Sequence, residues 1–272
     1  MQTEIESLRN ELNTATAIMQ RATRRARVLS GLALLVVTGA IGVSTLRPVG
    51  AQGAYGTTLT SLQAQVNTLM NRTQYMSADS GAKTTTFSGC NVMVQSGSGY
   101  TDDHDMLRGL GNLIIGYNSN SYSLPHNGSH NLIVGDFQSY SGYGGIVAGY
   151  DNAISGAYAS VVGGWANSAS GMCSAILGGY RNSAQNLEAT VSGGEFNISS
   201  GVSSSVVGGD NNVASGIEAS VLGGYENNAA GWDSTISGGA FCYTGGNHNG
   251  GDFNSILGGF AISNTTLYGH TP

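Results

Sequence analysis

Hydrophobic and polar positions recur every fifteen residues between Ser160 and Gly239. The first two copies read SVVGGWANSASGMCS and AILGGYRNSAQNLEA. Each copy carries a Gly-Gly pair, and the pairs begin at Gly163, Gly178, Gly193, Gly208, Gly223 and Gly238. Self-similarity at a fixed short period predicts stacked structural units, each of which packs on its neighbours.

Three columns of the repeat predict an inward face. One column is β-branched: Val161, Ile176, Val191, Val206, Val221 and Ile236. A second column is small: Ala159, Ser174, Ala189, Ser204, Ala219 and Ser234. A third column is apolar: Met172, Leu187, Val202, Ile217 and Trp232. Because side chains alternate along a strand, positions 157, 159 and 161 are expected to share one face and to line the lumen of a narrow solenoid.

Two further columns predict corners. An Asn column reads Asn152, Asn167, Asn182, Asn197, Asn212 and Asn227. A Gly column reads Gly156, Gly171, Gly201, Gly216 and Gly231, with Asn186 in the remaining copy. Gly replaced only by Asn suggests a backbone with positive φ, so these residues are interpreted as structural turns rather than ligand contacts.

A coil of fifteen residues has room for two short strands and two tight corners, at roughly 3.3 Å per strand residue. The predicted fold is therefore an all-β solenoid, a parallel β-roll of stacked 15-residue coils. The chain contains 43 Gly without an every-third-residue pattern, which excludes collagen. Its columns are too regular for a disordered linker.

The N-terminal region predicts an anchor. Residues 1–27 combine an amphipathic helical pattern with an arginine cluster, and residues 28–46 contain no charged residue. Nineteen residues of helix span roughly one hydrocarbon core, about 28 Å, and the arginines would stay in the cytoplasm. Residues 28–46 are expected to be an uncleaved transmembrane signal anchor or a signal peptide cut after Ala51. In both cases the rest of the chain is exported, either tethered to the membrane or secreted.

Residues 57–78 carry apolar side chains at heptad spacing. These are Leu59, Leu62, Val66, Leu69 and Met76. The pattern favours a short coiled-coil neck that joins several chains, and a single amphipathic helix is the alternative. Residues 79–107 are polar and irregular, so they are expected to be a linker or cap, with the solenoid over residues 108–272.

Irregular stretches interrupt the solenoid. The acidic cluster Asp102–Asp105 is interpreted as a solvated turn, with a divalent cation site as the less favoured reading. The segment 117–131, which holds His126 and His130, is predicted to be an inserted loop. After the last regular coil, Phe260, Ile262, Leu267 and Tyr268 are expected to cover the open end.

Two columns are expected to point outward. Val162, Leu177, Val207 and Leu222, with Ser192 and Ser237 in the remaining copies, form a largely apolar column that suggests a subunit interface. Tyr150, Trp165, Tyr180 and Tyr225 form an aromatic column, interrupted by Glu195 and Asp210, which could stack on sugar rings. Stacked repeats align like residues in any case, so a structural role is favoured for the aromatic column.

The repeat resembles the head of YadA-like trimeric autotransporter adhesins, whose motif runs S-V-A-I-G-x-x-S-x-A-x-G. Ser160, Val161, Val162, Gly164, Asn167, Ala169 and Gly171 fall in the same register. Gly163 replaces the isoleucine of the family. The resemblance covers about residues 108–268, and it implies a left-handed, trimeric β-roll displayed on a bacterial surface. In that family the neck and the membrane barrel follow the head, whereas here a helix and an apolar segment precede it, so adhesion to host tissue does not carry over.

From residue 84 onward the chain has twelve acidic and two basic residues, a net charge of −10, which excludes nucleic acid as a partner. No nucleophile–base spacing or phosphate loop is present, so no enzyme, cofactor or metal function is predicted. The spacing of Cys90, Cys173 and Cys242 matches no metal motif. The sequence favours a structural or adhesive surface module that is a homotrimer. A carbohydrate- or matrix-binding protein is the alternative.

Overall fold

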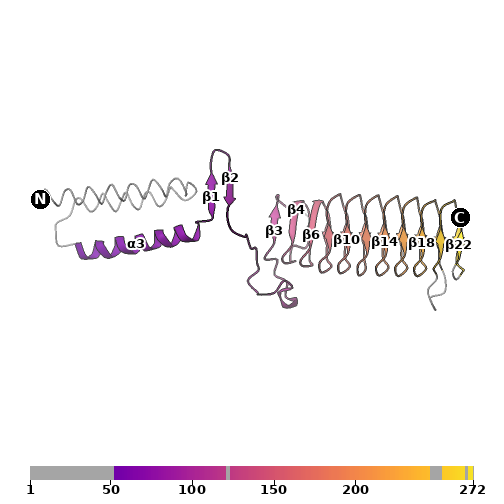
Figure 1. Cartoon of the computed structure of the whole chain (residues 1–272), viewed down its shortest axis with the longest axis horizontal. Coiled ribbons are helices and arrows are strands. Elements are labelled where there is room, and N and C mark those ends of the chain that lie inside the picture. The colour runs from indigo at the N-terminus through magenta and orange to yellow at the C-terminus, as the bar shows by residue number, and fades with distance from the viewer. Residues whose placement is uncertain (1–51, 121–122, 246–252, 267–268, 272) are drawn as a thin grey trace. The chain divides into compact units, whose positions relative to one another are not determined.

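The computed structural model describes residues 52–120, 123–245, 253–266 and 269–271 (Figure 1). The predicted segments 1–27 and 28–46 lie outside these residues. Among the helices that the structure describes, none has the length and apolarity to cross a membrane. The chain divides after Met93 into two compact units, which are described separately.

The first unit contains helix α3 (Gln52–Arg72) and a β-hairpin. The helix covers most of the predicted neck but ends before its last heptad. Thr73 donates its hydroxyl to the Leu69 carbonyl, and Met76, predicted as a neck residue, instead begins strand β1 (Met76–Asp79). Strand β1 pairs antiparallel with β2 (Thr84–Phe87).

The hairpin corrects the prediction that residues 79–107 are irregular throughout. The Asp79 carboxylate accepts the backbone N–H groups of Gly81 and Ala82, which closes the turn between the two strands. A short 3-10 turn, η2 (Asp103–Asp105), lies in the cap that leads into the solenoid.

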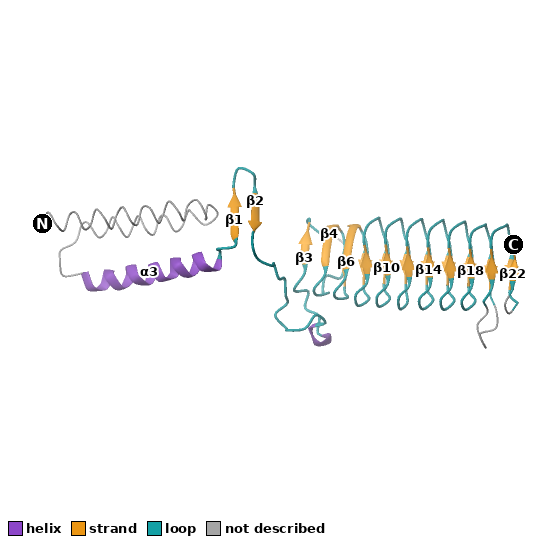
Figure 2. Ribbon diagram, viewed as in Figure 1, coloured by secondary structure: helices purple, strands orange, loops and turns teal. Residues whose placement is uncertain are grey.

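The second unit is a parallel β-solenoid, as the fifteen-residue period predicts. The strands labelled from β3 to β22 in Figure 2 stack side by side in one sheet, joined by turns. An 11-stranded sheet contains β3 (Leu113–Ile115), β4 (Leu132–Asp136), β6 (Ile146–Tyr150), β8 (Ser160–Val161), β10 (Ala175–Ile176), β12 (Thr190–Val191), β14 (Ser205–Val206), β16 (Ser220–Val221), β18 (Thr235–Ile236), β20 (Ser255–Ile256) and β22 (His270–Thr271). A nine-stranded sheet contains β5 (Ser139–Tyr140), β7 (Ala153–Ile154), β9 (Ser168–Ala169), β11 (Ser183–Ala184), β13 (Ile198–Ser199), β15 (Val213–Ala214), β17 (Asn228–Ala229), β19 (Tyr243–Thr244) and β21 (Ser263–Asn264).

Each regular coil contributes one strand to each sheet, in fifteen-residue register. Ser160 pairs with Ala175, and Ser168 pairs with Ser183. The second residue of each strand points into the lumen, where the side chains of Val161, Ile176 and Ala169 are fully buried. The β-branched and small columns therefore line the lumen as predicted.

The third column, which contains Met172 and Ile217, does not line the lumen. Half of the Met172 side chain is exposed, and Ile217 is also exposed. The reason is a left-handed residue between this column and the small column, which breaks the alternation of side chains. That corner residue has positive φ in every regular coil: Tyr158, Cys173, Glu188, Ser203, Glu218 and Asp233.

The Gly column marks close packing rather than positive φ. None of Gly156, Gly171, Gly201, Gly216 and Gly231 has a left-handed backbone. A Cβ on Gly171 would lie 1.9 Å from the Asn186 carbonyl oxygen of the next coil. Glycine is favoured at this column because the stacked backbones leave little room for a side chain, and only Asn186 replaces it.

The Asn column forms a buried hydrogen-bond ladder. The Asn167 side-chain oxygen accepts the Asn182 backbone N–H at 2.9 Å, and the Asn167 amide donates to the carbonyls of Gly163 and Gly179. The same oxygen-to-backbone bond links Asn152, Asn167, Asn182, Asn197, Asn212, Asn227 and Cys242. Asn118 and Gln138 extend the ladder toward the first coils. These side chains satisfy backbone groups that would otherwise be buried without partners.

The ends of the solenoid depart from the regular coil. At the C-terminal end, Ile262 packs against the core, but Phe260 is largely exposed and does not cover the last coil. Leu267 and Tyr268 lie outside the described residues. At the other end, the inward side chain of Ile114 is half exposed because no coil precedes β3 in the sheet.

Candidate functional site

The outer face of the 11-stranded sheet carries the apolar column that the sequence predicts. Each strand of this sheet from β4 to β20 buries its second residue, so the next residue along points outward. The side chains of Val162 and Leu177 are 52% and 59% exposed, and Val207 and Leu222 are similar. The face therefore presents a row of unpacked apolar side chains on a rigid scaffold.

This face also lacks charge. Two columns point outward from the sheet, and neither contains Asp, Glu, Lys or Arg between Leu132 and Leu257. The first column reads Leu132, Ile146, Ser160, Ala175, Thr190, Ser205, Ser220, Thr235 and Ser255. The second reads Val134, Ala148, Val162, Leu177, Ser192, Val207, Leu222, Ser237 and Leu257. An apolar, uncharged surface in an acidic chain is a candidate protein-contact surface.

The aromatic column lies beyond the Gly-Gly pair of each coil. Tyr150, Trp165 and Tyr180 are joined by successive parallel β-bridges, which continue through Glu195 and Asp210 to Tyr225. The Tyr150 and Trp165 ring centroids are 6.2 Å apart, and those of Trp165 and Tyr180 are 4.9 Å apart. The structure thus brings three of the four predicted ligand-binding residues together.

Phenylalanines extend these contacts from a neighbouring column. Phe137 packs edge-on against Tyr150, Phe196 against Tyr180, and Phe241 against Tyr225, each with centroids 5.4 Å apart. All three phenylalanines have positive φ. These phenylalanines were not predicted, because an alternating pattern does not show that a left-handed residue turns its side chain toward the ring of a neighbouring coil.

The aromatic side chains therefore form two arrays rather than one ladder. The first runs from Phe137 to Phe196, and the second runs from Tyr225 to Phe260. Asp210 occupies the column between them. Because the rings pack on one another, much of each array serves the corner itself, although Trp165 remains 51% exposed.

Charged side chains differ between the two arrays. The Arg181 guanidinium lies 5.2 Å from the Tyr180 ring centroid and 5.9 Å from that of Phe196, within cation–π range. In the second array a hydrogen bond and the charge of Glu226 raise the pKa of Tyr225, helped by burial and by Asp210. The Tyr225 phenol therefore stays neutral and able to donate.

The acidic cluster is only partly the solvated turn that was expected, because Asp105 is exposed whereas Asp103 is buried. Asp103 is only 3% exposed, and its Oδ1 atom accepts the hydroxyls of Ser96 and Ser98 at 2.5 and 2.6 Å. The hydroxyls of Ser129, Ser96 and Ser98 hold the pKa of Asp103 well below its usual range. Among the described residues no group of three or more His, Cys, Asp or Glu is arranged to hold a metal ion.

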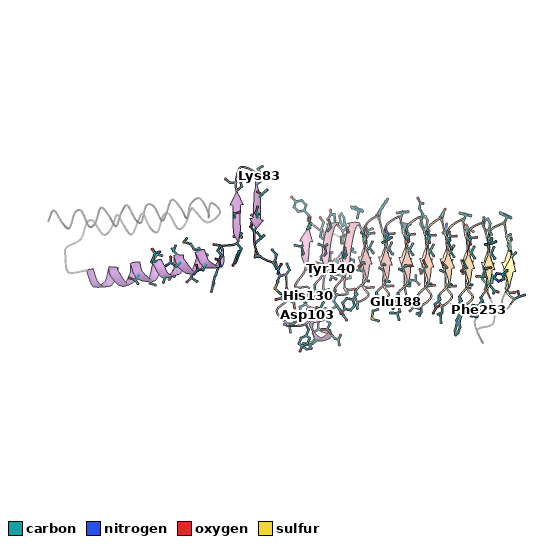
Figure 3. The ribbon with its side chains drawn as sticks, viewed as in Figure 1. Lys83, Asp103, His130, Tyr140, Glu188 and Phe253 are labelled. Atoms are coloured by element: carbon teal, nitrogen blue, oxygen red, sulfur yellow. The ribbon has the colours of Figure 1, made fainter. Side chains whose placement is uncertain are left out.

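Both histidines of the 117–131 loop make structural contacts. The His130 ring accepts the Ser96 backbone N–H at Nε2, and Nδ1 lies 2.9 Å from the Thr101 carbonyl. Figure 3 shows His130 and Asp103 on the same end of the solenoid. His126 stacks on Tyr140 with centroids 4.9 Å apart. The loop is thus tied to the cap and the first coils.

The predicted neck residues divide into three groups. The side chain of Leu59 is not described, Leu62 and Val66 are half buried, and Leu69 is exposed on α3. Met76 lies in β1. The cysteines are all free: Cys90 and Cys173 are exposed, and Cys242 is buried in the position of the Asn column.

Comparisons with known proteins add no family to this geometry. The chain matches no protein-family model and no curated protein sequence.

Proposed function

We propose that this chain is an exported, surface-displayed structural or adhesive β-solenoid that acts as a homotrimer. In this proposal the outer face of the 11-stranded sheet contacts the other subunits. The observation that carries it is the row of exposed apolar side chains at Val162, Leu177, Val207 and Leu222 on a face without charge. Burying such a row against a second chain removes apolar surface from water.

Three sequence features support the rest of the proposal. The uncharged segment 28–46 follows an arginine cluster, which is typical of a signal anchor that exports the following chain. The heptad positions Leu62, Val66 and Leu69 lie on helix α3 and suit a neck between several chains. The similarity of the repeat to trimeric adhesin heads favours three subunits.

The proposal is tested by the mass of the full chain in a mild detergent, measured by light scattering. We expect about three times the chain mass of 27.8 kDa. Leu177→Lys combined with Leu222→Lys should release monomers, because three buried ammonium groups would meet at each position. Ser183→Lys combined with Val213→Lys, on the outer face of the nine-stranded sheet, is the matched control and should remain trimeric.

A monomeric wild-type chain would overturn the trimer. Unchanged mass in the Leu177/Leu222 variant would overturn this face as the interface. A monomer would favour the second candidate function, which is binding of a carbohydrate or matrix polymer by the first aromatic array. The observation in its favour is the exposure of Trp165 and Tyr150. Retention of the chain on an insoluble β-linked glucan, lost in Trp165→Ala, would then identify that function.

A further inference from the structure

Successive coils of the solenoid are not equivalent. On the outer face of the 11-stranded sheet, Val162, Leu177 and Ser192 are followed by Val207, Leu222 and Ser237, each 45 residues later. The strands that carry them are consecutive neighbours: β8, β10, β12, β14, β16 and β18. The outward column therefore repeats every three coils, with two apolar residues and then a serine.

Three other columns share the same three-coil order. The first outward column reads Ser160, Ala175, Thr190 and then Ser205, Ser220, Thr235. An inward column reads Ala169, Ala184, Ser199 and then Ala214, Ala229, Thr244. At the corner, Phe196 and Phe241 close equivalent aromatic pairs with Tyr180 and Tyr225. A three-coil order therefore recurs outside, inside and at the corner, whereas the small inward column alternates Ala and Ser every two coils.

The outer face is consequently banded. In strand β12 the outward neighbours of buried Val191 are Thr190 and Ser192, and in β18 the outward neighbours of buried Ile236 are Thr235 and Ser237. These two rows carry a hydroxyl at both outward positions, whereas the other rows carry Val or Leu at the second position and Ser or Ala at the first. Strands lie about 4.8 Å apart, so the hydroxyl rows recur about every 14 Å along the solenoid.

We propose that the Thr190/Ser192 and Thr235/Ser237 rows set the axial register in which copies of this chain pack on this face. The inference rests on the proposed homo-oligomer and specifies how its subunits align. At equal height, hydroxyl rows meet hydroxyl rows and exchange hydrogen bonds, while Val and Leu meet Val and Leu. A polar residue in an otherwise apolar seam fixes the register of coiled coils in the same way.

A slip of one or two coils breaks this match. It places Ser192 and Ser237 of the second outward column against Val or Leu, where their hydroxyls lose water and gain no partner in that column. A slip of three coils restores the pattern but leaves three coils at each end without a partner. The equal-height arrangement is therefore the one that combines full overlap with matched rows.

Charge favours a second copy as the occupant of this face. The solenoid is strongly acidic, so two copies repel each other wherever their carboxylates approach. The two outward columns of the 11-stranded sheet contain no charged residue between Leu132 and Leu257. The outer face of the nine-stranded sheet is also uncharged there, but Ser141, Ser155, Ser170, Ser200 and Ser215 make it polar. Apolar and uncharged surface coincide on the banded face.

The register is tested in the full chain after the three native cysteines are replaced by serine. Two differently tagged copies are co-expressed and treated with a short thiol cross-linker. One copy carries Leu177→Cys. The other carries a cysteine at the same height (Leu177→Cys), one coil away (Val162→Cys) or three coils away (Leu222→Cys). We expect the same-height pair to cross-link at least about tenfold faster than the one-coil pair.

The decisive variant replaces the hydroxyl side chains of both rows with valine. This variant combines Thr190→Val, Ser192→Val, Thr235→Val and Ser237→Val. It should reduce the preference for the same-height pair over the one-coil pair to less than about threefold, because slipped arrangements no longer bury these hydroxyls. The matched control combines four substitutions on the outer face of the nine-stranded sheet: Ser155→Val, Ser170→Val, Ser200→Val and Ser215→Val. This control should leave the preference for the same-height pair unchanged. β-Branched valine is compatible with both strand faces.

The outcomes separate this inference from the proposed function. A monomeric chain without cross-links would overturn both. A trimer whose one-coil pair reacts as fast as its same-height pair, or whose preference survives filling of the rows, would overturn the register alone. The inference is supported if the same-height pair cross-links faster and if only the valine variant of the banded face removes that difference.

Discussion

At the scale of single residues, the solenoid depends on groups that satisfy the backbone from inside. The Asn ladder is the clearest case, because each side chain serves its own coil and the next one. Asn197 accepts the Asn212 backbone N–H and donates to the Gly193 and Gly209 carbonyls. An invariant column of this kind reflects backbone hydrogen bonding rather than recognition.

The Gly column makes a prediction about space. Gly171→Ala should lower the free energy of unfolding by about 3 kcal/mol or more, because its Cβ would collide with the Asn186 carbonyl of the next coil. Gly178→Ala is the matched control, since no atom lies within 4 Å of its Cβ and its φ is not left-handed. Its stability should change by less than about 1 kcal/mol.

Both variants are compared with the wild-type chain by urea unfolding monitored by circular dichroism. Equal midpoints for Gly171→Ala and Gly178→Ala would contradict close stacking as the reason for the column. The sequence identified these glycines as corners but assigned the wrong cause. It could not distinguish positive φ from close approach, because both constraints select glycine.

At the scale of elements, the N-terminal cap is held by one buried carboxylate. The Asp103 carboxylate accepts the hydroxyls of Ser96 and Ser98, and the Ser96 backbone N–H donates to His130 Nε2. The pKa of Asp103 is lowered in the folded chain, from a usual value of 3.8. Its contribution to stability is therefore fully present above about pH 4 and is lost progressively as the pH falls from there toward the lowered pKa of the folded chain.

Acidification should consequently release the cap before the coils. We expect the amide resonances of Ser96 and Ser98 to shift or broaden as the pH falls well below 4, toward the lowered pKa of Asp103. In Asp103→Asn these resonances should already be perturbed at neutral pH, and their acid response should disappear. Asp105→Asn, at an exposed position of the same turn, is the control and should behave as wild type. An acid response that persists in Asp103→Asn would assign it to another group.

Elements with strict periodicity were predictable, and those whose geometry changes at one residue were not. The sequence predicted the parallel β-roll and its lumen column through Val161, because a fifteen-residue period and β-branched residues determine both. It misplaced Met172 because the left-handed Cys173 rotates the chain by one face. It missed the β1–β2 hairpin because that short polar hairpin has no repeat partner from which it could be recognised.

At the scale of the whole molecule, the regular coils behave as a nearly one-dimensional array. Each coil contacts the coil before it and the coil after it through the same strand pairs and the same Asn bond. The register of Ser160 with Ala175 continues unchanged through Thr190, Ser205 and Ser220. Such an array should tolerate a change in length only when whole coils are removed.

Excision of residues 205–219 tests this property. The deletion joins Ser204 to Ser220, so Asn197 would stack directly on Asn227 and Val191 on Val221, with every column kept. We expect a folded chain whose thermal midpoint falls by no more than about 5 °C, because one nearest-neighbour interface is lost.

Excision of residues 205–211 is the counterpart, because it would place residues of the nine-stranded sheet against strands of the 11-stranded sheet. That chain should lose its cooperative transition in circular dichroism. If both deletions fold equally well, the stacked columns do not determine the register. If neither folds, the solenoid is a single cooperative unit rather than an array of independent coils.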